Sequence, residues 1–346
     1  MRKIVIRRPG GFGKIELADV PPPAVEPGTV RVRVHAAGVN FADCVARMGL
    51  YASARQYAGW PLTPGFEVAG IVDAVGTGVP QHVLGTKVIG LTRFGGYADQ
   101  AVIPLAQIFD LPATLSFEEG AAFPVIFLTA YYALHELACP PADSAVLIHS
   151  AAGGVGSALV QLCRAHGNFV VAIVGSRGKA EMVRSLGANG VIVKCEQDWR
   201  KEARSHVPEG YSAVFDASGT TLRGSYSLLA PRGRLIAYGA HGVMTKSGAL
   251  AGLPLTALRY ALLPRFNPLA LTNDNKSIMG FNLSYLFDET ELMQTSLRRI
   301  LALLQDGTIK VPPITRFPLE NAAEAHEALQ SGATIGKLIL TCRASA

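Results

Sequence analysis

The sequence predicts an α/β protein in which a β-rich part precedes a parallel sheet covered by helices on both faces. Up to about residue 115 the chain consists of short, partly alternating runs rich in Val and Ile, without helical periodicity between them. From residue 145 onward, apolar strands alternate with amphipathic helices, which is typical of a doubly wound parallel sheet. With 346 residues the chain is long enough for two domains.

The β-rich part is divided by turn signals at Pro21-Pro22-Pro23 and Pro27-Gly28. It contains the runs KIVIRR, TVRVRVHAAGV, VAGIVDAVG, TKVIGL and YADQAVIP. Near residue 116 the pattern changes to helical periodicity. Ser116 and Glu119 form a capping-box pattern there, and Pro124 predicts a break in the helix.

The alternating part begins with SAVLIHS and its following helix, and it continues through the strands FVVAIVGS, GVIVK, YSAVFDAS and RLIAYGA. The helices between them are predicted from GGVGSALVQLCRAHG, KAEMVRSLGA and TLRGSYSLLAPRG. The chain ends with helices around 289–306 and 319–331 and a last strand, GKLILT.

Composition excludes several classes of protein. Apolar residues make up 49% and charged residues 17% of the chain, which is a globular composition. The net charge of +6 suits anionic ligands, but no stretch interleaves basic and aromatic residues, so we expect no nucleic-acid binding. The start MRKIVIRRPGG is charged and lacks an apolar core segment, so we expect no signal peptide. The most apolar stretch, 248–266, is interrupted by two Pro and two Arg, so we expect no membrane span.

Five cysteines are spaced too widely for a zinc clip, and their odd number argues against a disulfide framework. We therefore expect reduced, mostly buried thiols in a cytoplasmic protein.

The segment AVLIHSAAGGVGSALVQLCRAHG (145–167) has the pattern of a dinucleotide-binding turn, with Ala in the first glycine position. It follows an apolar strand and opens a helix, whose free N–H groups and dipole favour a pyrophosphate. The alternative is a glycine-rich turn without a ligand, which this context disfavours. The expected cofactor-binding residues of the turn are Ala151, Gly153, Gly154, Val155 and Gly156.

The next strand-to-helix turn, in VVAIVGSRGK (170–179), indicates which dinucleotide binds. An NAD site places an acidic residue about 20 positions after the glycines, but the first carboxylate here is Glu181, inside the next predicted helix. Ser176, Arg177 and Lys179 instead offer donors and cations to a 2′-phosphate. We therefore expect NADP(H) as the cofactor; the alternative is that the two cations merely solvate a loop.

Four stretches resemble the zinc-free quinone oxidoreductase branch of the medium-chain dehydrogenase/reductase superfamily. They are AAGVNFADCVARMGLY (36–51), PLTPGFEVAGIVDAVGTGV (61–79), GGYADQAVIP (95–104) and the glycine-rich turn. The C-terminal part, from IMGFNLSYLF to AAEAHEALQSGATIGKLIL, resembles the subgroup of vesicle amine transport protein homologues.

The resemblance implies a fold and an assembly. A GroES-like catalytic domain would comprise residues 1–125 and 271–346, with a Rossmann NADP-binding domain of residues 126–270 inserted between them. It also implies a homodimer in which RLIAYGA is an edge strand that extends the sheet across a two-fold axis.

No metal site is expected. Zinc-containing members use a Cys in the segment that matches 38–43 and a His in a Gly-His-Glu motif. This chain has Asn40 or Phe41 near the first position and Phe66 at the second. Phe cannot bind zinc, and Cys44 alone does not supply three protein ligands.

The resemblance implies a zinc-independent, NADPH-dependent reductase that transfers hydride to a hydrophobic quinone or α,β-unsaturated carbonyl. One alternative is an enoyl-thioester reductase in which Tyr51 donates a proton. The other is an NADPH-binding or trafficking protein with little turnover. Hydride transfer itself would be the chemistry of the cofactor.

Three residues are catalytic candidates by this resemblance. Asn40 would donate to a developing oxyanion or hold the cofactor; alternatively it is a turn residue. Asp43 would lie near the nicotinamide; alternatively it caps a helix. Tyr51 would be the proton donor, or an aromatic residue that lines the cleft.

Seven further residues are implied to hold the nicotinamide end or to face the cleft, whereas His135, His149 and His326 receive no catalytic role. The seven are Thr129, Tyr238, Gly239, Phe281, Asn282, Leu283 and Lys337. The apolar segment 247–271 is interpreted first as a lid or pocket wall, and otherwise as a subunit contact or an interfacial helix.

Overall fold

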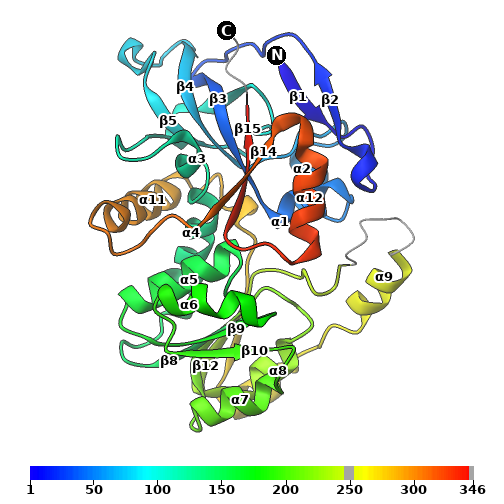
Figure 1. The fold of residues 1–346 in the computed structure, drawn as a ribbon, viewed down its shortest axis with the longest axis vertical. Helices are drawn as coiled ribbons and strands as arrows, with labels where there is room; N and C mark the ends of the chain where they lie inside the picture. The colour runs from blue at the N-terminus through cyan, green and yellow to red at the C-terminus, as the bar shows by residue number, and fades with distance from the viewer. Residues whose placement is uncertain (245–252, 343–346) are drawn as a thin grey trace.

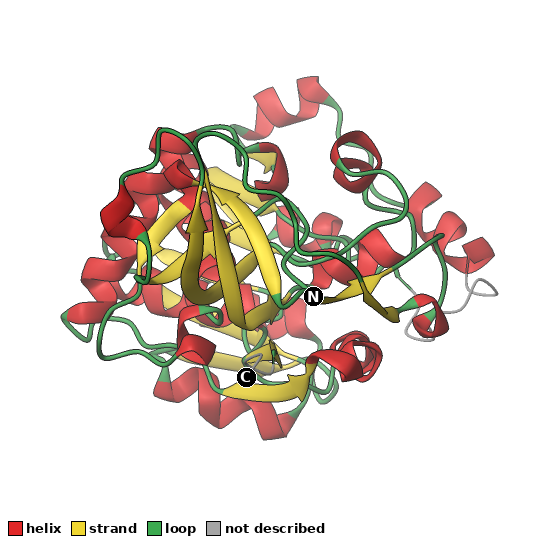
Figure 2. Ribbon diagram, turned by 90° about the horizontal axis from the view of Figure 1, so that it is seen from above, coloured by secondary structure: helices red, strands yellow, loops and turns green. Residues whose placement is uncertain are grey.

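The computed structural model describes residues 1–244 and 253–342, in which two large sheets form two domains, one above the other in Figure 1. Viewed from above, helices surround the strands (Figure 2). We call the part built on the seven-stranded sheet the GroES-like domain and the part built on the six-stranded sheet the Rossmann domain. The predicted α/β fold class is confirmed.

The GroES-like sheet joins the two ends of the chain. Its long strand β3 (Thr29–Val39) pairs antiparallel with β4 (Glu67–Val75), β6 (Gln100–Pro104) and the last strand, β15 (Lys337–Thr341). The sheet continues through β5 (Lys87–Leu91) and β7 (Ile108–Asp110) on one side and β14 (Ile314–Pro318) on the other. A separate hairpin contains β1 (Arg2–Val5) and β2 (Glu16–Asp19). The predicted return of the C-terminal strand to this domain is confirmed.

The GroES-like helices are short at the start of the chain and longer near its end. They are α1 (Phe41–Arg47), α2 (Ala52–Tyr57), α11 (Thr290–Gln305) and α12 (Ala322–Ser331). The apolar side chains of β3, β4, β15 and α12 share one buried core. A helix over CVARMG (44–49) was expected only in the alternative role of Asp43, and the structure has it as α1; α2 was not predicted, because six residues give little periodicity.

The connection between the domains is helical and begins as the sequence predicts. Ser116 caps α3 (Phe117–Gly120), where its Oγ accepts from the backbone N–H of Glu119 at 3.2 Å. α4 (Pro124–Tyr131) starts anew at Pro124 and continues into a π-helical segment, Tyr132–Ala138. Within the described residues, Phe117–Ala138 is the one helical stretch long and apolar enough to cross a membrane, yet 72% of its most apolar window is buried inside the protein. It is therefore packed here as a core helix.

The Rossmann sheet is parallel throughout, in the order β10-β9-β8-β11-β12-β13. Helices α5 (Gly154–Ala165) and α6 (Ala180–Ser185) lie above it in Figure 1, and α7 (Trp199–His206) and α8 (Leu222–Ser227) lie below. The strand order reverses between β8 and β11, which creates a crevice at the carboxyl ends of the strands. The strands are β8 (Ala145–Ile148), β9 (Phe169–Val174), β10 (Gly190–Val193), β11 (Tyr211–Asp216), β12 (Leu229–Ala237) and β13 (Ser277–Gly280).

The prediction that RLIAYGA is an edge strand is wrong. This segment lies in β12, which pairs on one side with β11 and on the other with β13. β13 comes after residue 270, where we expected the Rossmann domain to end, and its four residues are too few to predict a strand from periodicity. The edge of the described sheet is therefore β13.

The predicted apolar segment 247–271 falls partly on residues 245–252, which lie outside the described residues. The rest contains α9 (Leu253–Ala261), which stands to the side of the Rossmann domain in Figure 1 and leads to α10 (Pro268–Asp274). Leu258, Tyr260 and Leu262 are 55%, 71% and 73% exposed. The expected role of this segment as a lid or pocket wall stays a prediction.

Candidate active site

The glycine-rich turn lies between β8 and α5, at the centre of the Rossmann sheet. A Cβ on Gly156 would come within 2.3 Å of the backbone oxygen of Ser150, so no larger residue fits this turn. Gly153 is exposed and precedes the first turn of α5 without a side-chain cap. The first N–H groups of a helix have no partner within it. The turn therefore offers donors and a positive dipole end to an anion.

The turn also touches the other domain. Gly153 and Gly336 form a parallel bridge, and the N–H of Gly336 donates to the carbonyl of Ala152 at 3.3 Å. Gly336 is followed by Lys337, the first residue of β15. The predicted phosphate-binding turn is thus placed directly against the strand that carries a candidate site residue.

The cationic loop follows β9, the neighbour of β8. Ser176 and Arg177 are exposed, and the Arg177 guanidinium forms a two-pronged contact with Glu196: Nε to Oε1 at 3.1 Å and Nη2 to Oε2 at 2.8 Å. The Lys179 ammonium donates to the backbone oxygens of Gly332 at 2.7 Å and Thr334 at 2.8 Å. Neither cation is merely solvated. Glu196 was not considered from the sequence, because it follows the next strand, β10.

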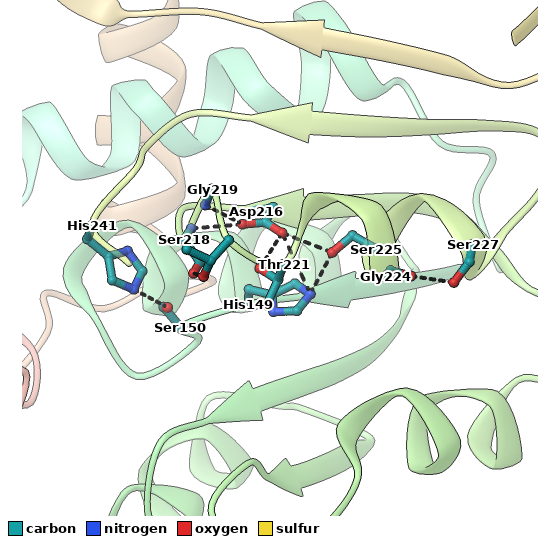
Figure 3. Close-up of polar contacts among 11 residues, drawn as sticks. His149, Ser150, Asp216, Ser218, Gly219, Thr221, Gly224, Ser225, Ser227 and His241 are labelled. Carbon is teal, nitrogen blue, oxygen red and sulfur yellow. Dashed lines mark hydrogen bonds and ion pairs between the residues drawn. The ribbon is translucent and has the colours of Figure 1, made fainter. Parts of the chain in front are cut away.

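On β11, the strand next to β8, a buried carboxylate organises the loop at the carboxyl end (Figure 3). Asp216 Oδ1 accepts from the backbone N–H groups of Ser218 at 2.8 Å and Gly219 at 3.1 Å. Its Oδ2 accepts from the hydroxyls of Thr221 at 2.6 Å and Ser225 at 2.9 Å. Burial opposes ionisation, but these donors hold the pKa of Asp216 below its ordinary value. The carboxylate therefore fixes the loop after β11.

Two histidines flank this carboxylate. His149 Nε2 lies 3.0 Å from Ser225 Oγ and 4.0 Å from Asp216 Oδ2, and its ring meets Trp199 edge-on. Burial lowers the pKa of His149 to about 4, so the ring is neutral at pH 7. His241 Nε2 lies 3.3 Å from Ser150 Oγ, which ties the loop after β12 to the glycine-rich turn (Figure 3). These contacts are structural ones and give His149 no access to solvent.

The predicted nicotinamide residues gather where β12 and β13 end. Tyr238 and Gly239 follow β12, and Phe281 follows β13. The Phe281 ring centroid is 4.9 Å from that of Tyr132 and 6.5 Å from that of Tyr238. Burial raises the pKa of Tyr238. Thr129, on α4, donates its hydroxyl to the carbonyl of Val125 at 2.7 Å, so that proton is used within the helix.

Tyr51 reaches across from the GroES-like domain to this group. Its hydroxyl donates to Asn282 Oδ1 at 2.7 Å, and the same oxygen accepts from the N–H of Ser284 at 3.1 Å and from its hydroxyl at 3.0 Å. Burial raises the pKa of Tyr51, so it is protonated at pH 7. Its ring packs edge-on against Phe66 and Phe94. The ring contacts match the aromatic role considered for Tyr51, whereas its role as a proton donor stays a prediction. Leu283, between Asn282 and Ser284, is buried.

A second polar cluster joins both ends of the GroES-like domain. The Lys337 ammonium donates to Glu67 Oε1 and to Asn40 Oδ1, both at 2.6 Å, and Asn40 Nδ2 donates to Glu67 Oε1 at 2.9 Å. Glu67 Oε2 accepts from the N–H of Val125 at 2.7 Å, near the start of α4. A Cβ on Gly38 would come within 2.3 Å of Glu67 Oε1.

Glu67 is the residue that the sequence analysis missed. It directly follows Phe66, in a motif that was read only for zinc ligands. The sequence did carry a signal for Glu67: a carboxylate stands within an apolar run that predicts a buried strand. Such a residue points to a polar site, because a buried charge requires a partner. The side chains of Asn40 and Lys337 are satisfied within the cluster, and they are 9% and 3% exposed as residues.

Asp43 has the contacts of a helix cap. It is fully buried, and it accepts from the N–H groups of Asn40 and Gly65, each at 2.8 Å, and from the Tyr97 hydroxyl at 3.1 Å. Burial raises its pKa to about 7. Tyr97 also lies 3.3 Å from His326 Nε2. The N-cap of α1 is Asn40, and Asp43 is the third residue of the helix, where it completes a capping box. Asp43 therefore holds the start of α1 and the turn at Gly65 inside the domain, one turn later in the helix than the helix-cap alternative placed it.

A cavity of about 490 Å³ lies below the sheet, between α7 and α8, close to the ends of β10 and β11. Its walls carry three cations, three hydroxyls and an indole ring. The lining residues are Lys194, Trp199, Arg200, Thr220, Thr221, Arg223, Gly224 and Ser227.

Known proteins share this sequence and architecture. Residues 26–113 match the alcohol dehydrogenase GroES-like domain, and residues 186–340 match the zinc-binding dehydrogenase family. The human synaptic vesicle membrane protein VAT-1 homolog is 36% identical over 98% of this chain and 86% of its own length. The human quinone oxidoreductase is 32% identical over 98% of this chain and 97% of its own length. The chain belongs to the medium-chain dehydrogenase/reductase superfamily.

Within this superfamily the chain falls in the VAT-1 subgroup, and solved structures agree with its fold. The structure of human VAT-1 homolog-like protein has a TM-score of 0.83 and 30% identity, covering 100% of this chain and 99% of that one. Escherichia coli quinone oxidoreductase, complexed with NADPH, has a TM-score of 0.86 and 28% identity, covering 99% and 100%. The CurK enoyl reductase has a TM-score of 0.84 and 25% identity, covering 99% of each chain.

The matched family is described as zinc-binding, but this chain has Phe66 at the position that the resemblance aligns with the His ligand of zinc-containing members. Phe66 is 3% exposed, and its ring centroid lies 4.9 Å from that of Phe94 and 6.3 Å from that of Phe287. The Cys44 thiol is buried and lies 3.9 Å from the carbonyl of His326, on α12. Across residues 1–244 and 253–342, no three His, Cys, Asp or Glu side chains are grouped to hold a metal.

Proposed function

We propose that this protein is an NADPH-dependent reductase that transfers hydride to a hydrophobic quinone or α,β-unsaturated carbonyl without zinc. The observation that carries the proposal is the pair of turns after β8 and β9. The first can take a pyrophosphate on the start of α5, and the second offers Ser176 and Arg177 at the adjacent strand end. The human quinone oxidoreductase relative and the NADPH complex of the Escherichia coli enzyme support it.

The residues present fit this cofactor. The backbone of Gly175 and Gly178 is open, with no atom within 4 Å of a Cβ built at either position, so a phosphate can approach the loop between them. Arg177 presents the planar fork that suits a phosphate. When bound, NADPH would supply the hydride. The chain's own contribution is to bind the pyrophosphate and the 2′-phosphate, to orient the nicotinamide ring and to exclude water.

The acceptor would lie against the ring of Tyr51, which is partly exposed and packs edge-on against the buried rings of Phe66 and Phe94. The backbone N–H of Ser284 fixes which end of the Asn282 amide is the oxygen. Asn282 Nδ2 has no partner among the described residues, so this N–H₂ group remains for a ligand. A donor there would polarise the carbonyl of an acceptor as negative charge develops on its oxygen.

The zinc-free part of the proposal rests on Phe66 and its packing. A benzyl side chain has no lone pair for a metal, and its ring is fixed between Phe94 and Phe287. Quinones and enones are already electrophilic and need less activation than a simple alcohol does. The proposed reaction therefore matches the side chains that the site offers.

The test combines cofactor binding with turnover. We expect NADPH to bind more tightly than NADH, and NADPH to be oxidised in the presence of ortho-quinones, para-quinones or enones. Metal analysis of the active protein should find less than stoichiometric zinc. Tighter binding of NADH, or activity that follows the zinc content, would contradict the proposal.

Enoyl-thioester reduction is a second candidate, favoured by the Tyr51 hydroxyl and by the likeness to the CurK enoyl reductase. A phenol there can protonate the carbon next to the one that receives hydride. Tyr51→Phe separates the two reductases: loss of enoyl-thioester reduction with quinone reduction retained identifies Tyr51 as the proton donor. Equal retention of both activities contradicts that role.

A binding or trafficking role with little turnover is the third candidate, because the VAT-1 relatives are named as synaptic vesicle membrane proteins. Tight NADPH binding without NADPH oxidation by any acceptor of the panel would favour it.

We further propose a cytoplasmic homodimer that associates along the edge of β13, for which light scattering of the purified protein gives the mass directly.

A further inference from the structure

We propose that Glu196 is a built-in competitor for the 2′-phosphate of the cofactor. Its carboxylate occupies the two hydrogen-bond donors of the Arg177 guanidinium that would otherwise bind the 2′-phosphate. It therefore lowers the affinity of the protein for NADPH but not for NADH. The inference rests on the proposed function and concerns the same loop. It assigns to Glu196 the control of selectivity between the two dinucleotides.

The pairing is built into the register of the sheet. Val174 at the end of β9 lies opposite Val193 at the end of β10. Arg177 and Glu196 each come three residues later, so the two loops leave the same edge side by side. The N–H of Glu196 donates to the carbonyl of Val193 at 3.0 Å, which fixes the backbone of the second loop. The contact is therefore prescribed by the strands as well as by the two flexible side chains.

The carboxylate takes the place that a phosphate would take. Both oxygens of Glu196 engage the guanidinium, at 3.1 and 2.8 Å, in the geometry by which Arg also binds phosphate. The other cation of the loop, Lys179, is engaged by two backbone oxygens of residues 332 and 334. Lys194, two residues before Glu196, is exposed. An incoming 2′-phosphate thus meets Arg177 already holding an anion.

The pair is exposed enough to be exchanged. The Arg177 side chain is 82% exposed and that of Glu196 is 36% exposed. Exposed ion pairs contribute little to stability, and a phosphate carries more charge than a carboxylate, so the phosphate can displace it. The displaced carboxylate remains in the loop and repels the phosphate. NADH has no 2′-phosphate and leaves the pair intact.

The test is calorimetric titration of the full chain with NADPH and with NADH. Glu196→Gln removes the charge and keeps the shape. We expect it to lower the Kd for NADPH about five-fold and to change the Kd for NADH less than two-fold, as follows from the typical strength of exposed pairs. Glu181→Gln is the matched control, because Glu181 is an exposed carboxylate close by in sequence that contacts Arg184 instead. It should change neither Kd.

A double-mutant cycle tests whether Glu196 acts through Arg177. Arg177→Gln alone should raise the Kd for NADPH. In that background, Glu196→Gln should lower the Kd for NADPH less than two-fold, because no guanidinium remains for the carboxylate to release. A full five-fold decrease in the Kd for NADPH in that background would mean that Glu196 acts only as a nearby negative charge. It would overturn the inference that Glu196 competes for the Arg177 guanidinium.

Failure of the inference is separate from failure of the proposed function. Tighter binding of NADH than of NADPH by the unaltered protein contradicts the proposed cofactor. The role of Glu196 is tested separately, by the ratio of the Kd for NADPH in Glu196→Gln to the Kd in the unaltered protein. An unchanged or raised Kd for NADPH in Glu196→Gln overturns the inference. So does weaker NADH binding, because Glu196 would then hold the ribose hydroxyls.

Discussion

Two ion pairs of almost equal length lie in opposite surroundings. Lys337 and Glu67 are 2.6 Å apart, with side chains 3% and 0% exposed. Arg177 and Glu196 are 2.8 Å apart, with side chains 82% and 36% exposed. The first joins β15 to β4 in the interior of the GroES-like domain, and the second joins two loops at the mouth of the Rossmann crevice.

The difference shows that distance alone does not tell what an ion pair does. In the interior, removing one partner leaves a charge without water or a counter-ion, so the pair is a fixed part of the fold. At the surface, water and salt replace either partner at little cost, so the pair can open for a ligand. Asn40 belongs to the interior pair and thereby to the structure of the site.

The largest expected effect comes from breaking the interior pair. Lys337→Met leaves the buried Glu67 carboxylate with two neutral donors, the Asn40 amide and the N–H of Val125, but without a cation, and we expect it to lower the free energy of unfolding by about 3–5 kcal/mol. Urea unfolding followed by circular dichroism measures this change. Lys201→Met, at an exposed position of α7, is the control and should change stability by less than about 0.5 kcal/mol.

The double variant Lys337→Met/Glu67→Gln sharpens the same comparison. Since it removes both charges, it should be more stable than Lys337→Met. Strictly additive losses would show that the two side chains do not depend on each other, contrary to their 2.6 Å contact.

Next in size is the effect of Gly156→Ala. The added Cβ would lie 2.3 Å from the Ser150 oxygen, so the turn must shift, at a cost of about 1–3 kcal/mol. We expect a lower Tm and at least ten-fold weaker NADPH binding. Gly13→Ala, in the GroES-like domain and away from the proposed cofactor loops, adds a Cβ that meets no atom within 4 Å and should bind NADPH much as before. Similar behaviour of both variants in calorimetry would refute a specific role of the turn.

A pH-dependent effect distinguishes the buried interior of the GroES-like domain from the exposed loop. Burial lowers the pKa of His326 to about 3, from an ordinary value of 6.5. Between these values the unfolded chain binds a proton that the native protein does not, so His326 makes stability fall as the pH falls, by about 1.4 kcal/mol per pH unit. Asp43 acts in the opposite direction, because burial raises its pKa to about 7, and its contribution is lost as the pH rises through that value.

Comparing the free energy of unfolding of the unaltered protein with that of His326→Gln isolates the contribution of the histidine, because the contribution of Asp43 is common to both proteins. The variant should be less stable at pH 7.5, and the difference should shrink as the pH falls from 6.5 to 4. Unfolding free energies at several pH values measure it. A difference that stays constant would show that His326 titrates normally in the native protein.

The smallest expected effect is on the stability of the exposed pair. Glu196→Gln should change the free energy of unfolding far less than Lys337→Met does, and added salt should reduce even this difference. A loss as large as that of Lys337→Met would mean that the pair is structural and would erase the contrast between the two regions.

Strong local patterns were predictable from the sequence. Ser116 and Glu119 predicted the start of α3, and Pro124 predicted the start of α4, because capping and the missing proline N–H act within a few residues. The glycine-rich turn was predictable for the same reason. In contrast, β13 was missed and β12 was taken for the edge, because pairing between strands 40 residues apart leaves no local pattern.

The sequence by itself determined the α/β class, the place of the glycine-rich turn and the presence of two cations after β9. Only the tertiary structure decided what these side chains touch. It paired Arg177 with Glu196, enclosed Asp43 within its own domain and brought Lys337 to Glu67 across 270 positions of sequence. The physical reason is that turns and caps depend on neighbouring residues, whereas burial and charge pairing depend on which distant segments the sheets bring together.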